Sequence, residues 1–173
     1  MVLTFKIDLA KLTKPPVWRR VTVPANVTFD DFHYVIQWAF GWTNSHLHYF
    51  SQKPEGLDVV IGDPADHEWN EVMDSTKIKL SKVFTLAGQR FYYVYDFGDD
   101  WVHKITLEEM DTGQAKRADC IAGKGACPPE DCGGPRGYEE FKKIMAKPGH
   151  PDYEDMRVWG RGARRPTMGR CSF

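Results

Sequence analysis

Residues 91–107, FYYVYDFGDDWVHKITL, decide how this chain folds. Two runs rich in aromatic and β-branched residues flank the turn-forming pair Gly98-Asp99, and this pattern predicts a β-hairpin. Aromatic side chains occupy every odd position from Phe91 to Phe97. Because side chains alternate between the two faces of a strand, we expect one face of the first strand to be heavily buried.

The register of this hairpin decides which polar groups meet. A turn with an even number of residues would pair Asp96 with Trp101 and place His103 diagonally from Asp96 on the same face. Asp99 and Asp100 lie in the same turn. Clustered carboxylates and an imidazole could bind a divalent cation or act as a general acid–base pair. In the alternative, structural interpretation the acids shape the turn, and Asp96 caps backbone amides or orients His103.

The residues before the hairpin predict a ββα opening. Residues 2–9 and 17–23 alternate in part between apolar and polar, which predicts two strands joined by a proline-containing loop. Thr28 precedes apolar residues at helical spacing and Gly41 follows them, so we expect a helix over residues 28–40. The shorter elements expected next are strands within 46–51 and 57–61, a surface loop between 62 and 74, and a helical turn within 77–84.

The residues after the hairpin predict an appendage. Residues 119–137 are rich in Gly and Pro, which indicates an ordered but irregular loop laid over the sheet. Amphipathic spacing predicts helices over residues 138–147 and 151–159. The remainder has no periodicity.

This order of elements predicts an α+β fold with a mixed or antiparallel sheet and the main helix packed on one face. The ββα opening followed by further strands indicates a β-grasp-like ββαβ core. We expect one domain over residues 1–158, of which 118–158 form the loop-and-helix appendage. Residues 159–173 are expected to form a disordered basic tail.

Composition limits the possible classes of protein. The chain is 42% hydrophobic and 13% aromatic, which supports a packed core. It has 23 Lys and Arg against 24 Asp and Glu, and five of the Arg follow Met156 without any acid, which leaves 18 bases against 24 acids before that point. Such an acidic body repels phosphate, so any nucleic-acid contact must depend on a local patch. Without a signal peptide or apolar span, we expect a cytoplasmic protein with no membrane contact.

Cysteines form a second candidate site. The chain has four of them, at positions 120, 127, 132 and 171. In a reducing cytosol we expect thiols or metal ligands rather than disulfides. Cys120, Cys127 and Cys132, with His103 or His150 as a fourth ligand, would suit tetrahedral zinc. The spacing lacks a C-x2-C pair, so small buried thiols are the alternative.

The loop Pro128–Gly134 carries a third candidate. If it folds back over the hairpin, Glu130 and Asp131 join Asp99 and Asp100 in one acidic cluster. Arg136 could neutralise such a cluster and make it a structural network, or the cluster could hold a cation. The Gly-rich turns here match no phosphate-binding motif, and loop closure is their expected role.

Two further groups have structural interpretations. His46 and His48 are interpreted as ordinary core or surface histidines. The Arg-rich tail is interpreted as a solvated basic segment, since aromatic residues do not alternate with its arginines.

Two long motifs carry a family resemblance. YVYDFGDDWVHKITLE (93–108), CIAGKGACPPEDCGGPRGYEEF (120–141) and the opening WRRVTVPANVTFDDFHYVIQWAFGW together resemble the plasmid pRiA4b ORF-3 family over roughly residues 2–156. Some members are labelled transposon passenger or resolvase-like proteins, and the resemblance implies no established activity. Members usually end in an acidic, aromatic-containing segment. The Arg/Gly-rich end of this chain suggests a frameshift or a diverged terminus, which resequencing the gene would test.

Two functions from different classes remain. The favoured one is a non-enzymatic interaction or accessory module of plasmid or mobile-element origin, which binds a protein or nucleic-acid partner through its loop surface. The alternative is a metal-dependent, hydrolase-like enzyme that uses zinc or manganese. The candidate catalytic residues are Asp96, Asp99, Asp100, His103, Glu130 and Asp131. The candidate metal ligands are Cys120, Cys127, Cys132 and His103. A serine recombinase is disfavoured, because no Arg-Ser pair follows the first strand and no helix-turn-helix closes the chain.

Overall fold

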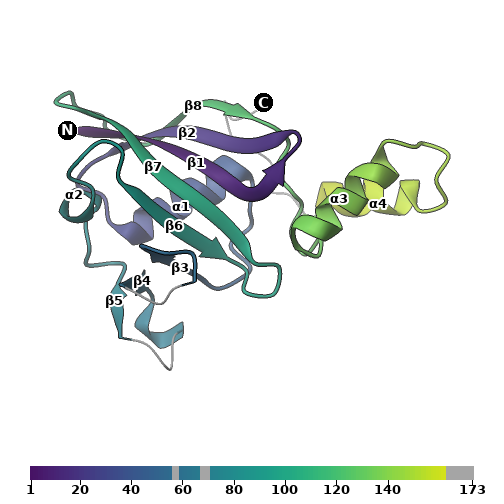
Figure 1. Ribbon diagram of the computed structural model, residues 1–173, viewed down its shortest axis with the longest axis horizontal. Helices are drawn as coiled ribbons and strands as arrows, with labels where there is room; N and C mark the ends of the chain where they lie inside the picture. Colours follow the sequence, from purple (N-terminus) through teal and green to yellow (C-terminus); the bar gives the residue numbers. More distant parts are fainter. Residues whose placement is uncertain (56–58, 67–70, 163–173) are drawn as a thin grey trace.

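The predicted hairpin forms two central strands of a single eight-stranded sheet in the computed structural model, which describes residues 1–55, 59–66 and 71–162 (Figure 1). The strands are β1 (Val2–Thr13), β2 (Pro16–Pro24), β3 (His48–Ser51), β4 (Val60–Gly62), β5 (Val72–Asp74), β6 (Arg90–Tyr95), β7 (Trp101–Asp111) and β8 (Asp119–Lys124). The helices are α1 (Phe29–Phe40), α2 (Leu80–Val83), α3 (Gly134–Met145) and α4 (Tyr153–Gly162), with a short 3₁₀ turn, η1 (Pro64–Asp66).

The strands lie in the order β5-β4-β3-β6-β7-β1-β2-β8. Neighbouring strands are antiparallel except β4 and β5, which are parallel. The sheet is therefore mixed, and the predicted α+β class with a ββα opening is confirmed. Among the residues that the structure describes, no helix is both long and apolar enough to span a membrane.

The main helix forms where its local signals place it. Thr28 and Asp31 make a reciprocal capping box, and Gly41 ends α1 in the left-handed conformation at φ 76°. The helix buries Phe32 and Ile36 completely against the sheet. The ring centroid of Phe32 lies 4.9 Å from that of Phe5 on β1, so α1 and the central strands share one aromatic core.

The register of the hairpin differs from the even-turn prediction. Tyr95 pairs with Trp101, so five residues form the turn and Asp96 lies outside the ladder. Asp96 and Asp100 both adopt positive φ, and the Asp100 N–H donates to Asp96 O at 2.7 Å, which closes this longer turn. His103 consequently faces the core opposite Tyr93 and does not share a face with Asp96. Phe97, expected to be buried, is 44% exposed because it lies in the turn.

Two strands lie in segments that were expected to be loops. β5 falls within the predicted surface loop at 62–74, and β8 falls within the Gly/Pro-rich segment. β8 pairs with β2 at the edge of the sheet, where contacts on only one side suffice to hold a strand. α3 begins at Gly134 rather than at 138, and α4 continues to Gly162. The predicted tail from 163 onward lies outside the described residues.

The two faces of the sheet are covered differently. α1 lies behind the strands in the view of Figure 1, while no helix crosses the face that points toward the reader. α3 and α4 pack against each other, with the rings of Phe141 and Trp159 5.7 Å apart, and project to one side of the sheet. The segment that links them to the body runs past the tip of the β6–β7 hairpin.

Candidate functional site

Asp96 is the first polar group at the tip of the hairpin. Its backbone is in the left-handed region at φ 56°, directly after β6. Its Oδ1 accepts hydrogen bonds from the N–H groups of Gly98 at 3.0 Å and Asp99 at 3.2 Å. The carboxylate is thereby oriented by its own turn, and Oδ2 faces His46, whose Nε2 lies 3.6 Å away.

Glu130 reaches this tip from the segment between β8 and α3. It is 4% exposed, and one carboxylate oxygen is fully engaged. Oε1 accepts hydrogen bonds from Thr43 N at 2.6 Å, Thr43 Oγ1 at 3.0 Å and the Tyr95 hydroxyl at 3.0 Å. Oε2 is buried and has no hydrogen-bond partner in the described structure. A buried carboxylate oxygen without a partner carries a desolvation penalty that a bound cation would remove.

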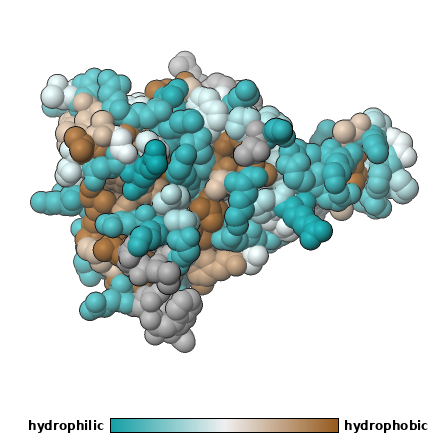
Figure 2. Space-filling view, in the orientation of Figure 1, coloured by the Kyte–Doolittle hydropathy of each residue, from teal (hydrophilic) through white to brown (hydrophobic). Residues whose placement is uncertain are grey.

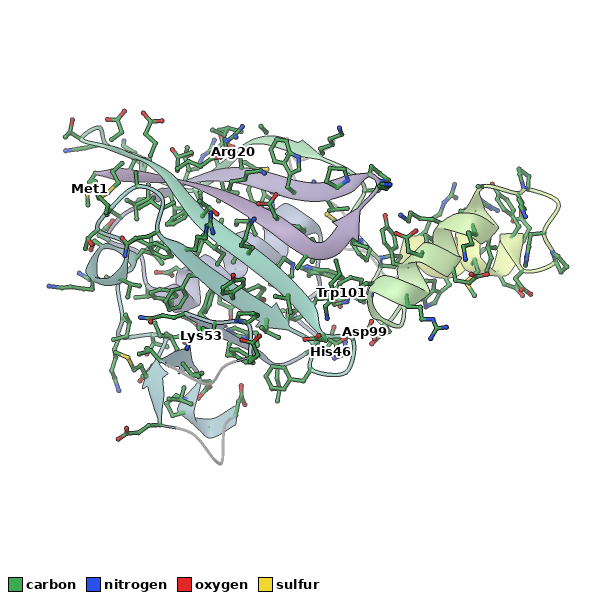
Figure 3. The ribbon with its side chains drawn as sticks, viewed as in Figure 1. Met1, Arg20, His46, Lys53, Asp99 and Trp101 are labelled. Atoms are coloured by element: carbon green, nitrogen blue, oxygen red, sulfur yellow. The ribbon has the colours of Figure 1, made fainter. Side chains whose placement is uncertain are left out.

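His46, which precedes β3, lies at the centre of these groups. Its Nε2 is 2.9 Å from Asp131 Oδ1 and 4.0 Å from Glu130 Oε2. Neither approach has the direction of a hydrogen bond, so the buried Nε2 is left without one in the described structure. Figure 3 shows His46 beside Asp99 at the hairpin tip, next to the start of α3.

These four residues form one potential ligand set, called here the hairpin-tip cluster: His46, Asp96, Glu130 and Asp131. Within the described part of the chain, His46, Asp96 and Asp131 are the one group of three whose potential ligand atoms all lie within 4.8 Å of one another. Glu130 adds a fourth atom, Oε2, close to the same imidazole nitrogen. An imidazole nitrogen and carboxylate oxygens that converge in this way are typical of a transition-metal site.

The charge of the cluster is negative. The ion pairs described for its three carboxylates all involve His46. Arg136, the predicted counter-charge, forms no ion pair with them among the described residues. Burial, and then the negative charge of Glu130, raise the pKa of Tyr95, so its hydroxyl stays protonated and donates to Glu130. Carboxylates this close together favour a cation between them.

Asp99 and Asp100, predicted in the same acidic cluster, have structural contacts instead. Asp99 Oδ2 accepts a hydrogen bond from Gly133 N at 3.0 Å and ties the turn to the segment that carries Glu130 and Asp131. Asp100 Oδ2 lies 2.6 Å from Lys11 Nζ in an exposed ion pair. Neither residue belongs to the group of converging ligand atoms.

His103, predicted both as an acid–base residue and as a metal ligand, is a core residue. It is fully buried, and its Nδ1 lies 2.9 Å from Trp101 O. Its ring packs edge-on against Phe40 at 4.8 Å. Burial lowers the pKa of His103 to about 4, so the ring is neutral at physiological pH.

The structure does not bring the predicted cysteine ligands together. Arg19 Nη2 donates to the buried Cys127 Sγ at 2.9 Å. Cys127 and Cys132 are reduced thiols, whereas Cys120 is disulfide-bonded and departs from the expectation of reduced cysteines. His150, the other proposed ligand, lies between α3 and α4 with Asp152 Oδ2 3.7 Å from its Nδ1. No cysteine belongs to a group of three converging ligand atoms in the described residues.

The sequence interpretation missed His46 as a ligand. Its only local signal is its place in the segment between α1 and β3, and it meets Glu130 and Asp131 through the fold alone. His46 also lines a cavity of about 660 Å³ together with His33 and His48. Both ring nitrogens of His33 lie near partners, Tyr93 Oη at 2.9 Å and Asn44 Oδ1 at 2.8 Å, so His33 is a structural residue.

Comparison with known proteins places the chain among relatives. Residues 1–167 match the family model described as plasmid pRiA4b ORF-3-like protein. The uncharacterized protein y4hQ of Sinorhizobium fredii (strain NBRC 101917 / NGR234) is 38% identical over 161 residues, which cover 91% of this chain and 80% of that protein. The crystal structure of MM3350, a protein of unknown function from Methanosarcina mazei Go1, is similar with a TM-score of 0.76 and 38% identity, covering 91% of this chain and 88% of that one. The chain therefore belongs to the plasmid pRiA4b ORF-3-like family.

Proposed function

We propose that this protein binds a divalent metal ion at the hairpin-tip cluster. Nε2 of His46, Oδ2 of Asp96 and Oδ1 of Asp131 supply three ligand atoms, and Oε2 of Glu130 supplies the fourth. The observation that carries the proposal is the buried Glu130 Oε2, which lacks a hydrogen-bond partner in the described structure and lies 4.0 Å from a similarly unbonded imidazole nitrogen.

A metal ion explains this arrangement better than a hydrogen-bonded network does. A network would pair each buried oxygen with a donor, as Thr43 and Tyr95 do for Glu130 Oε1. On the other side of the same carboxylate the cluster offers an acceptor without a donor and two further carboxylates. A cation would neutralise the three acids and occupy the orphaned lone pairs.

The ligand set favours manganese over zinc. Carboxylate oxygens suit hard cations such as Mn²⁺, whereas structural zinc sites are dominated by thiolates and imidazoles. Three carboxylates and one imidazole supply oxygen-rich coordination that leaves room for water on a six-coordinate ion. Mn²⁺ is therefore expected to bind more tightly than Mg²⁺, because the imidazole adds a nitrogen ligand that Mg²⁺ does not favour.

Metal titration of the EDTA-treated full chain tests the proposal. We expect saturable Mn²⁺ binding by electron paramagnetic resonance with one ion per chain. Asp96→Asn and Glu130→Gln should each weaken binding by at least about tenfold, since each removes a charged ligand. Asp100→Asn is the matched control, because Asp100 lies in the same turn but pairs with Lys11. A folded protein that binds neither Mn²⁺ nor Zn²⁺ would exclude a metal site here.

One observation also favours the hydrolytic alternative. The cavity of about 660 Å³ shares His46 with the cluster and is large enough for a small substrate. A metal-bound water is a nucleophile at neutral pH, and substrate in this cavity would lie next to the ion. Release of p-nitrophenol from bis(p-nitrophenyl) phosphate or p-nitrophenyl acetate, dependent on Mn²⁺ and abolished by Asp96→Asn, would support an enzyme. Metal binding without turnover of either ester would favour a non-enzymatic role.

A further inference from the structure

The open face of the sheet, opposite α1, carries a basic and aromatic patch. On β1, β2, β6 and β7 the odd-numbered side chains face the core, and the even-numbered ones face outward. Trp18, for example, is half-buried between Val17 at 2% exposure and Arg19 at 3%. The open-face patch is defined here by six residues: Lys6, Trp18, Arg20, Arg90, Lys104 and Lys124.

Strand pairing brings these residues into two adjacent rows. Lys6 pairs directly with Arg20 on β2. One step along the strands, Trp18 pairs with Lys124 on β8. The same two rows continue across β7 and β6, where Lys104 pairs with Tyr92. The rows therefore run across the strands, at right angles to them, over five neighbouring strands.

The patch is positive on a chain whose net charge is −1. Its five bases are accompanied by two acids, Asp8 and Glu108, which leaves three positive charges. Asp8 Oδ1 lies 2.8 Å from Lys6 Nζ, and Glu108 Oε2 lies 2.6 Å from Arg20 Nε. These ion pairs hold the basic side chains in place without neutralising the whole patch. Exposed acids on Glu109 and Asp111, at the far end of β7, mark its boundary.

Flat aromatic rings lie among these charges. Lys6 Nζ lies 5.4 Å and the Arg20 guanidinium 5.3 Å from the Trp18 ring centroid, so the indole is held by two cation–π contacts. Tyr92 adds a second half-buried ring in the same row as Trp18. Figure 2 shows this face as hydrophilic side chains interrupted by hydrophobic ones, rather than as one continuous apolar surface.

We propose that this face binds single-stranded nucleic acid across the strands. Phosphates would lie against the lysines and arginines, and unpaired bases would stack on Trp18 and Tyr92. Charge complementarity selects this occupant, because a polyanion with exposed planar rings matches both components of the patch. A duplex satisfies only the charges, since its bases are stacked internally and cannot reach the rings.

Fluorescence anisotropy of a labelled oligothymidylate of about 12 nucleotides tests the proposal, a length within the range that one single-strand-binding module covers. EDTA in the buffer removes metal, so the result does not depend on the hairpin-tip cluster. At three net contacts, the logarithm of the binding constant should fall with the logarithm of salt with a slope of about −2. A blunt duplex of the same length should bind at least about tenfold more weakly.

Variants separate stacking from charge. Trp18→Ala should weaken binding at least about tenfold at unchanged salt slope, and Trp18→Phe should retain most of the affinity because a ring remains. The double variant Lys104→Gln/Lys124→Gln should reduce the size of the slope by about 1.4. Lys142→Gln/Lys143→Gln, which removes two charges from α3, is the matched control and should change nothing.

Three results would overturn the proposal. They are the absence of saturable binding at about 50 mM salt, where electrostatic binding is strong; affinity that is unaffected by Trp18→Ala in a variant that unfolds at the wild-type temperature; and duplex binding as tight as single-strand binding.

Discussion

The Tyr95 hydroxyl donates a hydrogen bond of 3.0 Å to Glu130 Oε1, and so links the end of β6 to a segment 35 residues further along the chain. This contact, with two more from Thr43, holds one oxygen of the carboxylate and turns the other toward His46. Tyr95 thus acts on the proposed metal site without touching the ion. The same hydroxyl accepts a hydrogen bond from Ser45 N at 3.0 Å, so one tyrosine orients two sides of the cluster.

Tyr95→Phe should therefore weaken Mn²⁺ binding by about tenfold, the usual effect of losing a group that orients a ligand. It should also lower the free energy of unfolding by about 1–3 kcal/mol, because Ser45 N and Glu130 lose a buried partner. Mn²⁺ titration and urea unfolding in EDTA measure the two effects. Tyr34→Phe, at a position that is 52% exposed, is the control. Unchanged metal affinity in Tyr95→Phe would show that Thr43 alone orients Glu130.

Glu130→Gln should separate metal binding from stability. The amide oxygen can keep the hydrogen bonds from Thr43 and Tyr95, while the buried negative charge is removed. We expect the metal-free variant to be at least as stable as the metal-free wild type, since an unpaired buried charge is costly. Added Mn²⁺ should raise the unfolding temperature of the wild type and leave that of the variant unchanged.

Glu139→Gln on α3 is the matched control, because Glu139 is exposed and pairs with Lys142. That variant should show the full stabilisation by Mn²⁺. A metal-free Glu130→Gln protein less stable than wild type by more than about 1 kcal/mol would mean that the carboxylate is already compensated without an ion.

Gly134→Ala should destabilise the junction between the sheet and α3. Gly134 has φ 67°, and a Cβ there would lie 2.6 Å from Asp99 O. Left-handed backbone strain and this overlap together should lower the free energy of unfolding by about 1–3 kcal/mol. Gly149→Ala is the control, because its φ is not positive and an alanine methyl group there would meet no atom within 4 Å. Equal stability of the two variants in urea unfolding would contradict this prediction.

Stability should fall as the pH falls from about 6.5 toward 4. Burial lowers the pKa of His33 and of His103 to about 4 in the folded chain, whereas an unfolded histidine titrates near 6.5. In this window the unfolded chain binds protons that the folded chain does not, so the stability is complete above pH 6.5. Each histidine can contribute a loss of up to about 3 kcal/mol. Urea unfolding across this range should show a shallower decline for His103→Gln than for the wild type.

Elements whose signals are local could be predicted from the sequence. α1 has its cap, its apolar face and its terminal Gly41 within one short segment, and the hairpin has its strands on both sides of one turn. The register could not be predicted, because it depends on the positive φ of Asp96 and Asp100, which residue type alone does not dictate. β8 could not be predicted either, because its pairing with β2 joins residues about a hundred positions apart.

The candidate site shows the same division. Asp96, Glu130 and Asp131 are grouped correctly by the sequence, since a loop folding back on the hairpin brings them together. Proximity in the sequence to the acids favours His103 over His46 as the imidazole, and this prediction is wrong. The five-residue turn directs His103 into the core, and the ligand comes instead from a segment 84 residues before Glu130.

The position of β1 has a consequence for folding. β1 lies between β2 and β7, so one of its edges pairs with a neighbour in sequence and the other with a strand about a hundred residues later. During synthesis the β1–β2 hairpin leaves the ribosome with an apolar face and one open edge. It cannot complete its pairing until β7 has emerged. Such long-range closure slows folding and exposes a strand edge to other chains in the meantime. Nascent chains that stall before Trp101 should therefore be the most prone to aggregate.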